Sequence, residues 1–322
     1  MATSIRRLSL ASLVALAGAS ALAYAVPARG SNLLIVPTFD NTITSDPNHA
    51  AIEATINTDI ATLDSYIANP VTITITFGEM SSGLGQSSTY VGSESYSSYL
   101  SDLETKQTLS SQDTTALKSL GLSAPYTAAN PTANPVNGTT TIATTVPLLI
   151  GLGHTETLAD GATDSTIQFN STIVNDSRSG TQVSGNYDLQ SVVAHEMDEV
   201  LGVGGAGSQL NSGTVTGPVG PLDLFRYSGA NARSFTTSNA AISYFSIDGG
   251  KTDLVHFNQN GSADNSDFGD WGNGVSLGSG NTPAQVQDAY GGPNDEPNLG
   301  ANELGVTGVA RHLPASRTAF SA

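Results

Sequence analysis

Residues 186–202 constrain the fold of this chain more than any other segment, because their apolar residues follow the period of an α-helix. The apolar positions are Val192, Val193, Met197, Val200 and Leu201. Asp188 is a suitable N-cap and Gly202 a suitable C-terminal stop. His195 and Glu199 lie four residues apart, so a helix places both on one face. The segment therefore predicts a helix with an imidazole and a carboxylate side by side at the edge of its apolar side.

The remaining sequence predicts an α+β fold. Strand patterns cover 32–39, 71–77, 140–150 and 165–174, and helical patterns run from Asp46-Pro47 to Pro70 and over 99–120. Residues 80–99 are rich in Ser, Gly and Tyr and predict a loop with some strand. Glycine, proline and short β-prone runs dominate after residue 203. We expect a mixed sheet packed against two long helices, the second of them at a cleft, and a smaller irregular C-terminal lobe.

The N-terminus is typical of a secretory signal. Arg6 and Arg7 precede an apolar run over 8–22, and Ala23-Tyr-Ala25 fits a cleavage site. We expect cleavage after Ala25, a secreted or periplasmic product, and no membrane segment after cleavage. The mature chain is predicted to divide into an N-terminal lobe over 26–205 and a C-terminal lobe over 206–322.

The composition limits the partners and the chemistry. A net charge of −17 argues against a nucleic-acid partner, since phosphate binding needs clustered Lys and Arg. The chain has no cysteine, which excludes disulfides and thiolate metal ligands. Any metal ion must therefore be bound by His, Asp, Glu or water.

The sequence from His195 to Glu199 is HEMDE. In the HExxH helix of zinc peptidases, the two His bind the metal and the intervening Glu is the general base. Here Glu199 replaces the second His, and zinc also accepts carboxylate oxygen. We therefore predict that His195 and Glu199 are metal ligands and that Glu196 is the general base. The alternative is an acidic helix turn that only faces water.

A catalytic zinc site needs a third protein ligand. The extended pattern HExxHxxGxxH would place it at residue 205, which is Gly205 here. Asp223 is the first choice, because a lone carboxylate in an apolar segment needs a partner; an ion pair with Arg226 is its alternative. His256 is the second choice, with a hydrogen-bonded core histidine as its alternative. Nothing around His49, His154 or His312 supports a role.

Two weaker candidates complete the predicted site. Tyr227 is a candidate stabiliser of a tetrahedral oxyanion, although packing explains such a tyrosine as well. Residues 247–250 and 264–270 gather oxygen-bearing side chains, which makes calcium a second candidate ion, although ordinary Asx turns explain them as well.

Several longer stretches carry a family likeness, namely residues 40–43, 77–90, 191–202, 223–228 (DLFRYS), 244–250, 267–271 and 286–290. Through them the chain resembles secreted bacterial metalloproteases of the zincin type, up to about Leu304. The resemblance implies a zincin (metzincin-like) α+β catalytic domain whose edge strand pairs with an extended peptide. From about residue 304 the tail diverges from the Leu-Asp-x-Ile-Gly-Tyr type of ending in that family.

Together these features predict a secreted zinc-dependent endopeptidase that acts on a protein or peptide substrate, with Glu196 assisting attack of water on a peptide carbonyl. One alternative is a non-catalytic exported surface or matrix protein with structural calcium sites. Another is a metal-dependent hydrolase of a different bond, such as a cell-wall amide.

Overall fold

The computed structural model describes residues 33–67, 71–105, 111–122, 131–154, 165–272 and 283–311. The predicted signal peptide and His312 lie outside these residues. Within them the chain is a mixed α+β protein, which confirms the predicted class. Every helix in the described ranges is too short or too polar to cross a membrane.

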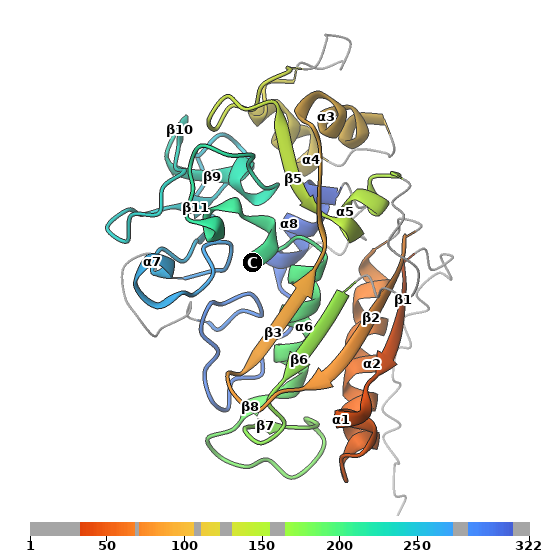
Figure 1. Cartoon of the computed structure of the whole chain (residues 1–322). Coiled ribbons are helices and arrows are strands. Elements are labelled where there is room, and N and C mark those ends of the chain that lie inside the picture. The colour runs from red at the N-terminus through yellow and green to blue at the C-terminus, as the bar shows by residue number, and fades with distance from the viewer. Residues whose placement is uncertain are drawn as a thin grey trace, which may run out of the picture.

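A four-stranded sheet forms the frame of the N-terminal half (Figure 1). Its order is β1 (Leu33–Phe39), β2 (Val71–Glu79), β6 (Ser165–Phe169) and β3 (Gly85–Thr89). The first three strands are parallel, and β3 runs antiparallel to β6 at the edge. The alternation predicted for 71–77 is confirmed, since Ile73, Ile75 and Phe77 are buried. Strand β3 comes from the stretch predicted as loop with some strand.

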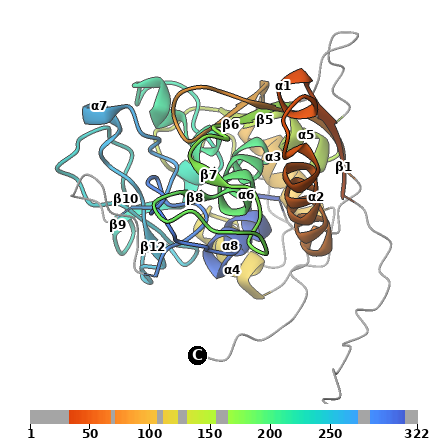
Figure 2. The same ribbon diagram turned by 90° about the horizontal axis from the view of Figure 1, so that it is seen from below.

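Three helices pack on this sheet. They are α1 (Asn41–Thr44), α2 (His49–Tyr66) and α6 (Leu189–Val200). Helix α2 contacts β1 and α6, and α6 contacts β3 and β6, so the two long helices share one face of the sheet (Figures 1 and 2). The predicted apolar stripe of α2 is buried at Ile52, Ile56 and Leu63. The helix begins three residues after Asp46, whose carboxylate instead accepts a hydrogen bond from the Asn48 amide.

A second core lies beside the sheet. Its buried residues include members of α3 (Tyr96–Thr105), α4 (Ser111–Ser119), β5 (Thr141–Thr145) and α5 (Val146–Gly151), and β4 (Val91–Ser95) pairs with β5. The helix predicted over 99–120 is thus present as two helices. The strand predicted over 140–150 is wrong in its second half, where α5 stands. The Thr145 hydroxyl caps that helix by accepting a hydrogen bond from the Leu148 amide, and Pro147 favours a first helical turn.

The residues after 200 form mostly short elements joined by loops, but α8 is an eleven-residue helix that the sequence analysis did not predict. They form η1 (Gly205–Gly207), η2 (Gln209–Ser212), η3 (Leu222–Phe225), β9 (Arg226–Gly229), β10 (Ala232–Arg233), β11 (Tyr244–Phe245), β12 (Val255–His256), α7 (Gly261–Asp264) and α8 (Ala301–Arg311). A short parallel pair, β7 (Val174–Asn175) and β8 (Tyr187–Asp188), precedes α6. The C-terminal residues share the second core with residues 96–152. The division at residue 205 stays a prediction.

A buried carboxylate on α2 gives the fold a pH dependence. Asp59 is 3% exposed, and one of its oxygens has no hydrogen-bond partner among the described residues. Burial raises its pKa to about 8, against the charge of Arg178 and with help from Asp188 and Asp198. The folded pKa exceeds the unfolded one, so the folded state keeps a proton that the unfolded chain releases. Stability is therefore lost as the pH rises from about 4 to about 8.

We expect Asp59→Asn to stabilise the fold at pH 8 by on the order of a few kcal/mol and to have little effect at pH 4. Urea denaturation followed from pH 4 to pH 9 measures this difference. Glu53→Gln, on a more exposed part of the same helix, is the control and should show no such gain. An equal gain at both pH values would contradict the assignment.

Candidate metal centre

Helix α6 carries the predicted ligands, and both of its predicted ends are confirmed. The Asp188 carboxylate accepts a hydrogen bond from the Ser191 amide (2.9 Å) and pairs with Arg178 (2.6 Å). Gly202 follows the last turn with φ +86°, a conformation that strongly favours glycine. The buried side of the helix packs into the sheet core, and its polar edge faces a cleft.

Three side chains converge on one point of that cleft: His195, Glu199 and Asp270. The Nε2 atom of His195 lies 3.6 Å from a Glu199 oxygen and 3.7 Å from an Asp270 oxygen. Ligands about 2.0–2.2 Å from a tetrahedral zinc ion are separated by roughly 3.3–3.6 Å. The imidazole nitrogen is therefore spaced from each carboxylate much as two ligands of one ion are, and beyond ordinary hydrogen-bonding distance. All three ligand atoms lie within 4.8 Å of one another.

The His195 ring is oriented by its other nitrogen. Its Nδ1 lies 2.8 Å from the carbonyl oxygen of Val286, to which it donates a hydrogen bond. That leaves the lone pair of Nε2 directed at the two carboxylates, with the Gln287 amide nitrogen 3.3 Å away. A metal-binding histidine is held in the same way by a carbonyl behind it. Lone pairs that face one another need a proton or a cation between them.

Both carboxylates are held in place by hydrogen bonds. The Ser87 hydroxyl of β3 donates to Glu199 (2.5 Å). The Gly205 amide donates to Glu199 (3.1 Å) and to Asp270 (3.0 Å), and the Gln287 amide donates to Asp270 (3.0 Å). A side chain at residue 205 would collide with the Glu199 carboxylate. The extended zinc motif has its third ligand at residue 205. In this chain the backbone N–H of Gly205 lies there instead and donates hydrogen bonds to both carboxylates.

Glu196 lies beside the three converging side chains and is 6% exposed. Its carboxylate occupies the space left by Gly85 of β3, where any Cβ would collide with it. Burial raises the pKa of Glu196 well above its usual range, and the charge of Glu199 raises it further. Glu196 therefore holds a proton more readily than an exposed glutamate, which suits a group that accepts and returns a proton.

The charges of the centre are unbalanced without a cation. Burial raises the pKa of Asp270 well above its ordinary value, and burial with the charge of Glu199 raises that of Asp267 to about 6. Burial alone lowers the pKa of His195, but the surrounding carboxylates outweigh it and raise that pKa strongly. A raised pKa means that a group favours its protonated form. The groups hold protons more readily here because the single imidazole does not balance the negative charge of the carboxylates. A divalent cation would balance that charge.

The cleft over these residues encloses about 280 Å³. Residues 84–87, which include the start of the edge strand β3, form one wall, and residues 284–292 with Ser266 and Asp267 form another. The site thus lies between the outer edge of the sheet, at β3, and loops from the C-terminal half.

Asp223 is not part of this centre, which corrects our prediction for the third ligand. It is fully buried, and its oxygens accept hydrogen bonds from the Ser208 hydroxyl (2.6 Å) and from the amides of Gln209 (2.9 Å) and Gly220 (2.8 Å). Through these hydrogen bonds the carboxylate connects the segment at residues 208–209 with Gly220. Arg226, the alternative partner, instead donates to Gln259 and to the carbonyl oxygens of Asn258 and Phe268.

Tyr227 also lies away from the cleft, so the structure does not support its predicted oxyanion role. It is buried in β9 under the guanidinium of Arg233, 4.7 Å from the ring centroid. His256 pairs with Asp253 (2.7 Å), and His49 lies 3.5 Å from Glu53.

The two candidate calcium stretches have different structures. In 247–250, Asp248 accepts hydrogen bonds from Ser246 and Thr252, as in an ordinary Asx turn. In 264–270, Asp264 closes a turn with Ser266, but Asp270 reaches into the centre with His195. The second stretch therefore supplies the third candidate ligand.

Comparisons with protein-family models, with curated proteins and with solved structures gave no match.

Proposed function

We propose that this protein is a secreted zinc-dependent endopeptidase in which His195, Glu199 and Asp270 hold the ion and Glu196 is the general base. The proposal rests on one observation. The oriented Nε2 atom of His195 faces the carboxylates of Glu199 and Asp270 at distances close to those between ligands of one metal ion. A catalytic zinc site has three protein ligands and an open position, and this group opens into a cleft.

The donor set favours zinc over calcium. Calcium takes six to eight oxygen ligands, whereas imidazole nitrogen suits zinc. The centre offers one imidazole, and its two carboxylates are already fixed by hydrogen bonds from Ser87 and Gly205. A structural calcium site is therefore the weaker assignment for these residues.

Zinc bound here would supply a Lewis acid that polarises a carbonyl group and acidifies water. Glu196 then takes the proton from the water that attacks the peptide carbonyl. The raised pKa of Glu196 lets the same carboxyl hold that proton and give it to the leaving amine. Gly85 keeps room for the Glu196 carboxylate next to the cleft.

The substrate that fits this cleft is an extended peptide. Strand β3 is the outer strand of its sheet, so within the described residues its second edge has no partner strand. An exposed sheet edge binds extended chains by adding a strand. The cleft lies along Gly85, Gln86 and Ser87 of this strand, so an added peptide would pass the candidate ligands. This arrangement, with the metal helix behind an antiparallel edge strand, supports a zincin-type fold.

We expect chelation to abolish cleavage of casein by the purified protein and stoichiometric zinc to restore it, because the proposed reaction needs the Lewis acid. Elemental analysis before and after chelation measures the bound metal in the same samples. Casein cleavage that survives complete removal of metal would contradict the proposal. So would protein that binds calcium in place of zinc and never cleaves.

A further inference from the structure

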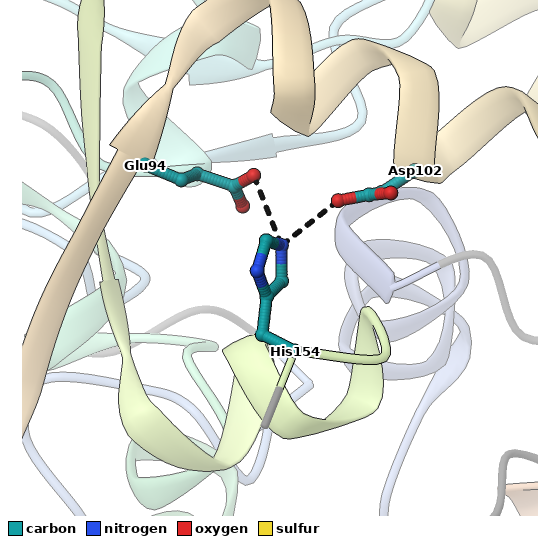
Figure 3. Close-up of side chains that lie close together, drawn as sticks. All are labelled: Glu94, Asp102 and His154. Atoms are coloured by element: carbon teal, nitrogen blue, oxygen red, sulfur yellow. Dashed lines mark hydrogen bonds and ion pairs between the residues drawn. The ribbon is translucent and has the colours of Figure 1, made fainter. Parts of the chain in front are cut away.

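A second group of potential ligands lies outside the cleft. Glu94 of β4, Asp102 of α3 and His154, which follows α5, direct their side chains toward one another (Figure 3). The Nε2 atom of His154 lies 2.8 Å from an Asp102 oxygen and 3.3 Å from a Glu94 oxygen. None of the three lines the cleft over His195, so this group is a separate feature of the fold.

The Glu94 carboxylate is the unusual member of this group. Its side chain is 5% exposed, and one of its oxygens lies 3.3 Å from the Nε2 atom of His154. Neither oxygen makes a well-formed hydrogen bond among the described residues, and that nitrogen is already hydrogen-bonded to Asp102. A buried carboxylate without hydrogen bonds is costly, and such groups are normally paired or bound to a metal. Figure 3 shows the carboxylates of Glu94 and Asp102 both directed at the same nitrogen of the His154 ring. The carboxylate thus points into the space that a ligand of the group would occupy.

We propose that Glu94, Asp102 and His154 bind a second divalent cation, with zinc favoured over calcium. The three ligand atoms lie within 4.8 Å of one another, and an imidazole with two carboxylates is a donor set that zinc accepts. The cation would replace the 2.8 Å hydrogen bond between His154 and Asp102, neutralise the two carboxylates and bind the Glu94 oxygens, which make no well-formed hydrogen bond of their own among the described residues.

The role of this site follows from the elements that it joins. Its residues come from a strand, a helix and the end of another helix, so one ion would fasten three segments. Strand β4 begins two residues after β3 ends, and β3 borders the cleft. Residues 85–95 thus run from the cleft, which Gly85 to Ser87 line, to the second site, which includes Glu94. The second ion would hold the end of this segment that is distant from the cleft. We assign it a structural role, because a ligand that binds only the folded state stabilises that state.

The competing explanation is a metal-free ion pair in which a protonated His154 balances the carboxylates. The two explanations differ in the number of zinc ions bound. We expect the full chain, stripped of metal and dialysed against zinc, to bind two ions, His154→Ala to bind one, and the control His49→Ala to bind two. His154→Ala with as many zinc ions as the unaltered chain would overturn the proposal.

Two further variants separate this site from the one on α6. His195→Ala removes a ligand of the first centre only, so it should still bind one zinc ion and melt several degrees higher with zinc than without. Glu94→Gln keeps the side-chain volume and should lose one ion, which tests the site even if His154→Ala fails to fold. No zinc in His195→Ala, or stabilisation by calcium but not by zinc, refutes the second zinc site. Failure of peptide cleavage alone bears only on the first centre.

Discussion

Glu196→Gln is expected to lower the rate of peptide hydrolysis by roughly 10²–10⁴-fold, the usual contribution of a general acid–base group. Glutamine keeps the shape of the side chain beside Gly85 but cannot accept the proton of the attacking water. The three candidate ligands remain, so the variant should retain zinc at the first centre. The measurement is kcat on a quenched fluorescent peptide, with bound zinc determined in the same preparation.

The matched control is Glu53→Gln, a substitution of the same chemistry on a partly exposed turn of α2 near His49. It should leave both the rate and the zinc content unchanged. An unchanged rate in Glu196→Gln would exclude Glu196 as the base. Loss of zinc from that variant would instead mean that Glu196 is itself a ligand.

The local sequence patterns predicted the regular elements well, because these patterns report burial directly. The alternation in 71–77 and the stripe from Ile52 to Ile67 correspond to β2 and α2. The error over 140–150 has a local cause, since β-prone residues there follow a threonine cap and a proline that start α5. The edge strand β3 was harder to identify, because its sequence GQSST has no apolar alternation. Its pairing with β6 is a tertiary interaction.

The difference between local patterns and tertiary packing also explains which residues of the candidate site the sequence predicts. His195, Glu196 and Glu199 lie on one helix, so their spacing predicts their proximity. Asp270 comes from a distant loop, and only the packing of the C-terminal residues brings it to His195. The cluster of oxygen-bearing side chains over 264–270 was a signal for Asp270, but it indicated calcium or Asx turns and did not connect this carboxylate with His195.

Asp223 is a buried carboxylate that needs partners, as its apolar sequence context indicates. Sequence alone did not show that a serine hydroxyl and two backbone amides supply them. Likewise, no local pattern around His154 predicted its proximity to Glu94 and Asp102, since three separate elements bring the group together.

Asp270 and Asp223 therefore offer a direct comparison between the geometry and the sequence motif. We expect Asp270→Asn to weaken zinc binding at the first centre by at least about 100-fold, because loss even of an outer-shell partner costs 10–100-fold. Peptide hydrolysis should fall with the bound zinc. The measurement is competition for zinc with a chromophoric chelator, using protein in which His154→Ala removes the second group.

Asp223→Asn is the matched control, a substitution of the same kind at a carboxylate that is equally buried. It should keep the zinc affinity and lower the free energy of unfolding by about 1–3 kcal/mol, since the amide group meets donors where the carboxylate accepted hydrogen bonds. The reverse result, with zinc lost from Asp223→Asn and kept by Asp270→Asn, would restore the ligand suggested by the motif. The convergence at His195 would then lose its meaning as a metal site, because its third carboxylate would be dispensable.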